Sequence, residues 1–329
     1  MSTLDTEVQR RARRRRYRDE FLAEWRNRHP DRSASLEQRI SSRIAALTSD
    51  RLALEGVSMD AADAAGLRDI VLETIVDEER PVFFVQDDWI NSDEVTIIGE
   101  EARELGDALH SAKARLQPLM PLIGRIDVTN FPGIDFVGTG WLVAEDIVVT
   151  NRHVANLIAR WDGRRYAFSR GIAGRPIAGS LCTAREFDDS TVDAARLFSI
   201  TEVLFIERDD SPYDIAFLRI KRRAIGTQPT RLVVSRENPS SSTQVVVVGY
   251  PARARADLIP DQALMQQLFR DRYDVKRAAP GYTMSMQGSA ARHDCTTLGG
   301  NSGSVVLDLR TGLAVGLHFA GLYREANSR

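Results

Sequence analysis

The stretch Gly299-Gly300-Asn301-Ser302-Gly303-Ser304, followed by the apolar run Val305-Val306-Leu307, has the composition of a loop that presents a nucleophile. Glycines on both sides of Ser302 let the backbone turn tightly and leave nearby amides unshielded. The amides of Gly300 and Ser302 can then point at one spot where an oxyanion would sit, which makes these two residues the candidate oxyanion hole. A serine in such a loop is chemically inert until a base removes its proton, so catalysis requires a base from elsewhere in the chain.

The chain supplies a base upstream of the serine and an acid between the two. His153 follows the strand-like run Ile147-Val148-Val149-Thr150, and the motif Gly138-Thr139-Gly140 lies just before that run. Asp214 stands at the start of a second apolar segment, Ile215-Ala216-Phe217-Leu218. The three candidate catalytic residues therefore occur in the order His, Asp, Ser, which is the chymotrypsin order and differs from those of the α/β-hydrolases and subtilisin.

These segments resemble the trypsin-like (chymotrypsin-fold) serine peptidases, and within them the bacterial branch that includes the glutamyl endopeptidases. The resemblance covers the chain from about Leu119 to its end. It implies two β-barrels and endopeptidase cleavage of a protein or peptide substrate through an acyl-enzyme, with no cofactor. It also implies that Ser302 attacks the scissile carbonyl, that His153 takes and returns the proton, and that Asp214 holds the imidazole in the right tautomer.

Three further residues connect the chain with the glutamyl branch. Asn301 stands where trypsin-type enzymes have the aspartate that pairs with a new N-terminal amine, so activation by that route is not expected. Thr297 and His318 occupy the positions at which glutamyl endopeptidases place the S1 groups that bind a carboxylate. Because a hydroxyl and an imidazole can form charge-assisted hydrogen bonds with an acidic P1 side chain, the resemblance implies cleavage after acidic residues.

The composition is that of a globular protein long enough for two domains. The chain has 329 residues, 43% hydrophobic and 27% charged, and a formal net charge of −2 that gives no overall attraction to nucleic acid or membrane. Neither an apolar window of eighteen residues nor a secretory signal occurs, so no membrane association is expected. Only Cys182 and Cys295 are present, which predicts a reducing, cytoplasmic location. His293-Asp294-Cys295 lacks a matching pair of ligands, so no metal site is expected.

The pattern of residues changes near Pro118. Residues 1–118 predict an α-helical regulatory or interaction region, and residues 119–329 predict the mainly β peptidase domain. Helices are expected at about 3–28, 33–47, 58–75 and 100–116, with a strand at 81–85. Strands are expected at 123–128, 140–143, 147–150, 203–206, 215–220, 244–249, 304–309 and 313–317, with a helix at 261–269.

The N-terminal region leaves alternatives open. Its six arginines, Arg10, Arg11 and Arg13 to Arg16, could bind phosphates of a nucleic acid, but Asp19, Glu20 and Glu24 follow at a spacing that allows pairing within a helix. We therefore favour a solvated face or a helix that binds a regulatory protein partner, and His110 is expected at a surface or interface. The alternative to the enzyme is a non-catalytic binding module, in which the barrel is a scaffold and the arginine-rich helix contacts nucleic acid or protein.

Overall fold

The computed structural model describes residues 79–93, 95–186, 193–221, 230–254, 262–287 and 290–319. The chain divides into two compact units, Met1–Leu67 and Arg68–Arg329, and every described residue belongs to the second unit. The first three helices expected from the sequence and the arginine run lie outside the described residues. Among the described residues, no helix is both long enough and apolar enough to cross a bilayer.

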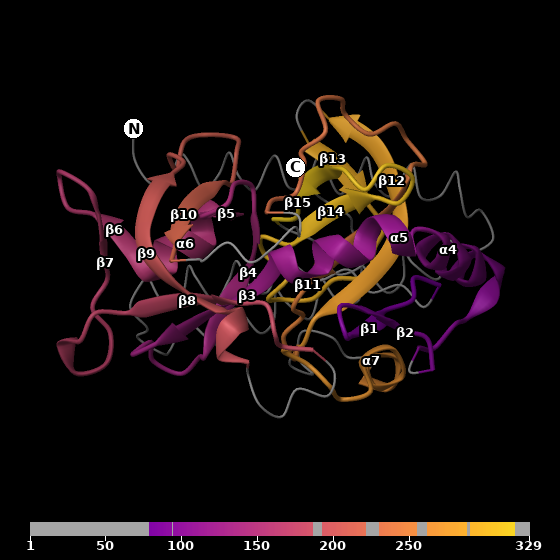
Figure 1. Cartoon of the computed structure of the whole chain (residues 1–329), viewed down its shortest axis with the longest axis horizontal. Helices are drawn as coiled ribbons and strands as arrows, with labels where there is room; N and C mark the ends of the chain where they lie inside the picture. The colour runs from indigo at the N-terminus through magenta and orange to yellow at the C-terminus, as the bar shows by residue number, and fades with distance from the viewer. Residues whose placement is uncertain are drawn as a thin grey trace, which may run out of the picture. The chain divides into compact units, whose positions relative to one another are not determined.

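The first half of the described unit is a closed antiparallel β-barrel (Figure 1). Its strands follow the order β10-β5-β4-β3-β8-β9 around the barrel. Alternation of apolar residues explains how the strands close around a core: in β10, for example, Ala216, Leu218 and Ile220 are buried, and the residues between them are half-buried. The six strands are β3 (Ile123–Thr129), β4 (Phe136–Leu142), β5 (Ile147–Thr150), β8 (Ala178–Cys182), β9 (Leu197–Ile206) and β10 (Ala216–Ile220).

The second half is a seven-stranded sheet in the order β15-β14-β11-β12-β1-β2, with β13 paired to β12 (Figure 1). Its central strand carries the run Val245 to Val248, all buried. Val246 and Val248 join one hydrophobic cluster, while Val245 and Val247 join another, so this strand is apolar on both faces. The strands are β1 (Phe83–Gln86), β2 (Trp89–Asn91), β11 (Gln244–Gly249), β12 (Arg277–Gln287), β13 (Ala290–His293), β14 (Val305–Asp308) and β15 (Ala314–Leu317).

Two strands that precede Leu119 in the chain are part of this second sheet. The β1–β2 hairpin joins it through β1, where Phe83 pairs with Ala278 of β12. The expected helix over 100–116 is divided at Ala112 into α4 (Gly99–Ser111) and α5 (Lys113–Leu116), followed by the 3-10 helix η2 (Gln117–Leu122). The boundary expected near residue 118 falls inside the second compact unit, which begins at Arg68. The change of composition near residue 118 coincides with the start of the first barrel strand, β3.

Smaller elements connect the strands. The catalytic candidate His153 lies in α6 (Arg152–Ile158), and a two-stranded hairpin follows directly. The sequence did not predict this hairpin, nor β2, β8, β12 and β13. The remaining elements are β6 (Ala159–Trp161), β7 (Tyr166–Phe168), η3 (Ile172–Gly174), η4 (Ala194–Arg196) and α7 (Gln262–Phe269).

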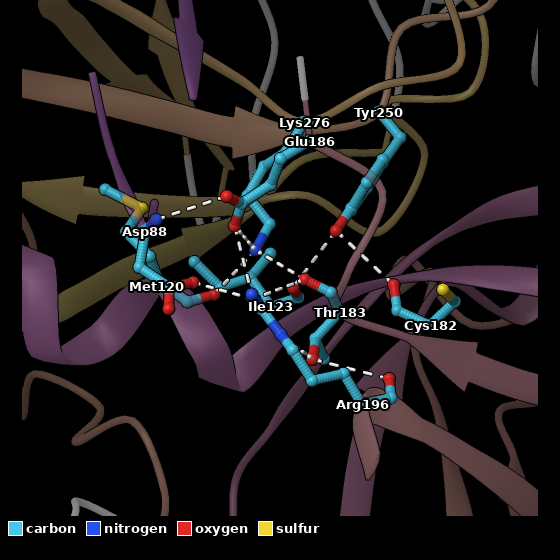
Figure 2. A network of polar contacts seen from close by, with 9 residues as sticks. All are labelled: Asp88, Met120, Ile123, Cys182, Thr183, Glu186, Arg196, Tyr250 and Lys276. Atoms are coloured by element: carbon cyan, nitrogen blue, oxygen red, sulfur yellow. Dashed lines mark hydrogen bonds and ion pairs between the residues drawn. The ribbon is translucent and has the colours of Figure 1, made fainter. Parts of the chain in front are cut away.

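A buried polar network joins the barrel to the second sheet (Figure 2). Lys276, next to β12, donates from Nζ to the carbonyls of Met120 and Thr183 at 3.0 Å each, and Nζ lies 3.5 Å from Oε1 of Glu186. Arg196 donates to the same Thr183 carbonyl at 2.7 Å. Burial lowers the pKa of Lys276 to about 8, against the attraction of the Glu186 carboxylate.

Candidate active site

The two halves of the molecule bring the three candidate catalytic residues together. His153 lies in the first turn of α6, and Asp214 lies in the loop that leads into β10, so both belong to the barrel. Ser302 lies in the loop that leads into β14 of the second sheet. The site therefore lies where the two halves meet.

The three side chains form a continuous chain of hydrogen bonds. Nδ1 of His153 lies 2.6 Å from Oδ2 of Asp214, and Nε2 lies 2.8 Å from Oγ of Ser302. Because an ionised carboxylate can only accept, the proton of the neutral imidazole belongs on Nδ1. The lone pair of Nε2 then faces the hydroxyl of Ser302, which is the arrangement of a base beside a nucleophile.

The surroundings of Asp214 keep it oriented and ionised. Its Oδ1 accepts from the backbone amide of His153 at 3.1 Å, and its carbonyl accepts from Nδ2 of Asn151 at 2.9 Å. Nε of Arg152 lies 4.0 Å from Oδ1. Burial raises the pKa of Asp214, but the charge and hydrogen bonds of His153, together with Arg152, outweigh burial and hold that pKa below its usual value.

The peptides of the nucleophile loop, residues 299–304, are held by their carbonyls. The Gly299 carbonyl accepts from the amide of Ala252 at 2.6 Å, and the Asn301 carbonyl accepts from the amide of Ser304 at 2.8 Å. In a trans peptide the N–H points opposite to the C=O. The N–H groups of Gly300 and Ser302, which share those two peptides, therefore point away from these anchors, as donors to an oxyanion must. Gly300 adopts φ of 87°, a left-handed conformation that favours glycine.

Asn301 makes a neutral contact in place of a charged one. The residue is 4% exposed, and its Oδ1 accepts from Oγ of Ser304 at 3.1 Å. This partner is a hydroxyl of the same loop, so the side-chain oxygen of Asn301 is bound by a neutral group.

The two candidate S1 residues are both buried. Thr297 lies in the segment between β13 and the nucleophile loop, and His318 directly follows β15. The backbone of His318 exchanges hydrogen bonds with the loop, accepting from Gly303 and donating to Ser304 at 2.8 Å each. Nδ1 of His318 lies 3.1 Å from Nε2 of His293, and burial lowers the pKa of His293 to about 3, which keeps its ring neutral.

Several residues of the site were not assigned a role from the sequence. Asn151 and Arg152 hold Asp214, and His293 lies behind His318. The first two stand directly before His153 in the chain, so their proximity to the base was visible in the sequence. His293 has no such signal, because only strand pairing brings it to His318. Within the described part of the chain, no three His, Cys, Asp or Glu side chains are grouped as metal ligands.

Comparison with known proteins identifies the class of this fold and site. The family model described as "Trypsin-like peptidase domain" matches residues 138–317, which is more than half of the chain and includes all three candidate catalytic residues. The chain therefore belongs to the trypsin-like peptidase family. The mainly β fold with a barrel and the activity of a serine endopeptidase, both expected from the sequence, are confirmed at this level.

Individual relatives are more distant. A protein of Lysobacter enzymogenes described as a probable serine protease is 27% identical over 298 residues, which covers 82% of this chain and 73% of the relative. Among solved structures, a Glu endopeptidase is 20% identical with a TM-score of 0.41, covering 65% of this chain and 85% of that chain. The Rv3671c protein of M. tuberculosis H37Rv, in an inactive form, is 17% identical with a TM-score of 0.39, and the match covers 66% of this chain and 84% of that chain.

Proposed function

We propose that Ser302, His153 and Asp214 are the catalytic triad of this serine endopeptidase. One observation carries the proposal: hydrogen bonds of 2.6 Å and 2.8 Å connect the carboxylate, the imidazole and the hydroxyl without a gap. The low pKa of Asp214 supports it, because an ionised carboxylate stabilises the imidazolium that forms during the reaction.

In the first half of the reaction, Oγ of Ser302 attacks the scissile carbonyl carbon while Nε2 of His153 takes the hydroxyl proton. The carbonyl oxygen becomes an oxyanion held by the amides of Gly300 and Ser302. When the tetrahedral intermediate collapses, the C–N bond breaks and the leaving amine takes the proton from Nε2. The products of this half are the free amine and an ester between Ser302 and the acyl part of the substrate.

In the second half, water takes the place of the amine. Nε2 of His153 removes a proton from the water as its oxygen attacks the ester carbon. The second tetrahedral intermediate breaks its bond to Oγ of Ser302, which recovers the proton from Nε2. A carboxylic acid leaves, and the enzyme returns to its starting state with no cofactor consumed.

We further infer that the enzyme prefers acidic P1 residues. The backbone of His318 is joined by two hydrogen bonds to the loop that carries the reacting serine. If neutral His293 donates from Nε2 to Nδ1 of His318, the proton of His318 lies on Nε2, from which it can donate to a substrate carboxylate. The hydroxyl of Thr297 would supply a second donor.

Residues 1–67 form the other compact unit, and we propose that this unit restrains or recruits the peptidase through a protein partner.

We also propose a reducing, cytoplasmic location, which the two buried, free thiols of Cys182 and Cys295 support. Burial raises the pKa of both thiols, which favours inert structural cysteines.

An active-site label tests the triad. A fluorophosphonate probe should attach to Ser302 of the full chain, as mapped by mass spectrometry, and Ser302→Ala should abolish both labelling and peptide cleavage. Loss of about a million-fold in kcat is expected for this change, and His153→Ala should cost a similar factor because the triad acts as a unit.

The chain offers a matched control in a second serine–histidine pair. Oγ of Ser92 lies 2.6 Å from Nε2 of His110, but Nδ1 of His110 lies 2.8 Å from the Gly106 carbonyl, with no carboxylate behind it. Ser92→Ala and His110→Ala should therefore leave labelling and cleavage unchanged. Cleavage by the Ser302→Ala protein, or a label found at Ser92, would refute the proposed triad.

A further inference from the structure

Thr139 belongs to the barrel strand β4, yet its polar atoms contact the nucleophile loop of the other half. Its backbone amide donates to the Ser302 carbonyl at 2.7 Å, and its Oγ1 donates to the Gly300 carbonyl at 2.9 Å. Its own carbonyl accepts at 2.7 Å from Oγ1 of Thr150, which precedes His153 by three residues. Thr139 and Thr150 are both fully buried, so water does not compete for these bonds.

The direction of the hydroxyl hydrogen bond is fixed by its neighbours. Oγ1 of Thr139 also accepts from the amide of Tyr250 at 3.2 Å. Tyr250 is held in turn by its hydroxyl, which donates toward the carbonyls of Ile123 and Cys182 at 3.3 Å and 3.4 Å (Figure 2). Since an amide N–H can only donate and a carbonyl can only accept, the single hydroxyl proton of Thr139 points to Gly300.

The hydroxyl completes the anchoring of the nucleophile loop. The carbonyls of Gly299, Asn301 and Ser302 are each held by a backbone amide. The Gly300 carbonyl, between the two proposed oxyanion donors, accepts from the Thr139 side chain. The peptide that carries this carbonyl links the peptide of the Gly300 amide to that of the Ser302 amide, so its rotation would turn one donor relative to the other.

Tight packing transmits the position of Thr139 to the loop. A Cβ added to Gly303 would lie 2.1 Å from the Thr139 carbonyl oxygen and 2.5 Å from Oγ1 of Thr150. The two backbones are therefore in direct contact at this point, and only a residue without a side chain fits there. With φ of 82°, Gly303 also adopts a conformation that other residues rarely take.

We propose that Thr139 is a positioning residue that sets the oxyanion hole: its hydroxyl fixes the Gly300–Asn301 peptide so that the amides of Gly300 and Ser302 converge. The inference rests on the proposed function of these amides and of Ser302. Thr139 touches no reacting atom itself. It acts across the junction of the two halves, and through Thr150 it connects the strand before His153 with the loop of Ser302.

Substitution of the hydroxyl by a methyl group tests this role in the full chain. Removal of one oxyanion donor costs about 100- to 1,000-fold in kcat, so Thr139→Val, which misorients the donors without removing them, should lower kcat by about 10- to 100-fold. KM should change little. Inhibition by a substrate-like peptide aldehyde, whose adduct with Ser302 carries an oxyanion, should weaken by a factor similar to that in kcat. Thr139→Ser keeps the hydroxyl and should restore both values to near wild type.

Thr283→Val provides a control for general loss of stability. Thr283 is buried on β12 and makes the same pair of hydrogen bonds, donating to the Ser240 carbonyl and accepting from the amide of Thr243. Its loss should destabilise the protein about as much as Thr139→Val while kcat is retained. All values of kcat are measured per active site titrated with the fluorophosphonate, so a variant that folds only in part still gives a result.

The outcomes separate this inference from the proposed triad. If Ser302→Ala remains active, the triad fails and the role of Thr139 fails with it. If Ser302 stands as the labelled nucleophile and Thr139→Val keeps the wild-type kcat, only the role of Thr139 is overturned. The role is also overturned if Thr139→Ser is as slow as Thr139→Val, because packing of the methyl group would then explain the effect, or if Thr283→Val lowers kcat equally.

Discussion

His318 is the residue at which selectivity for substrates can be tested most directly. If its ring donates to the P1 carboxylate, His318→Ala should lower kcat/KM for a glutamate P1 by about 100-fold or more, since a site built to hydrogen-bond a substrate group loses heavily without it. A small apolar P1 residue makes no such bond, so its kcat/KM should change only a few-fold. Steady-state rates on two peptides that differ only at P1 measure this ratio.

Thr297 allows a matched comparison at the same scale. Thr297→Val removes the hydroxyl and keeps the shape, whereas Thr297→Ser keeps the hydroxyl, so only the valine variant should lose preference for glutamate. A library profile that favours basic or bulky aromatic P1 residues would remove the acidic-P1 hypothesis and leave the triad untouched.

Strand β1 determines where the peptidase can be shortened. A chain that begins at Arg68 keeps the β1–β2 hairpin and α4, and should unfold in denaturant at nearly the same concentration as the full chain. A chain that begins at Leu119 loses Phe83, Phe84 and Val85, all fully buried. At about 1.5–3 kcal/mol for each such side chain, and with more lost from α4, the deficit approaches the whole stability of about 5–15 kcal/mol of a typical protein.

Comparison of these two shortened chains with the full chain also tests regulation. The proposed restraint or recruitment predicts that the chain from Arg68 differs from the full chain in kcat/KM on a peptide, or in cleavage of protein substrates. Equal values on both would reduce residues 1–67 to a passive extension. A folded, active chain from Leu119 would contradict the structural role assigned to β1.

The sequence predicted elements well where local chemistry determines them. The run of β-branched residues from Val245 to Val248 predicts strand β11 by itself. The glycines around Ser302 likewise predict a tight loop. Strand β12 was missed because Pro280 and Gly281 interrupt its pattern, while its place is set by pairing with β11 and β1. The approach of His293 to His318 was missed for the same reason: strand pairing, which joins distant segments, produces it.

At the scale of the whole molecule, Lys276 couples the junction of the two halves to pH. Its pKa is about 8 in the folded protein, against 10.5 for an ordinary lysine, so between these values the unfolded chain binds more protons than the folded one. Burial of the charged lysine therefore destabilises the fold by its full amount below about pH 8. This destabilisation decreases as pH rises toward 10.5, because the buried lysine loses its proton. This group alone should raise the free energy of unfolding by up to about 1.4 kcal/mol per pH unit in that window.

Lys276→Met isolates this effect from other groups that titrate in the same range. Glu186, Arg196, Asp88 and Tyr250 face the ammonium group and are present in both proteins. The difference in unfolding free energy, wild type minus variant, should rise from pH 8 to pH 10 in denaturant titrations. Parallel pH profiles for the two proteins would show that Lys276 keeps an ordinary pKa in the fold.

The pairing of β1 with β12 also has a consequence for the synthesis of the chain. Phe83 finds its partner Ala278 only after roughly two hundred further residues have left the ribosome, which takes about 10–40 s at ~5–20 residues per second. For that interval an apolar strand edge lacks the neighbour that covers it in the finished protein. The nascent chain should therefore need a chaperone at this edge. Because Ser302 follows Ala278 in the chain, the nucleophile is synthesised only after the strand residue that pairs with Phe83.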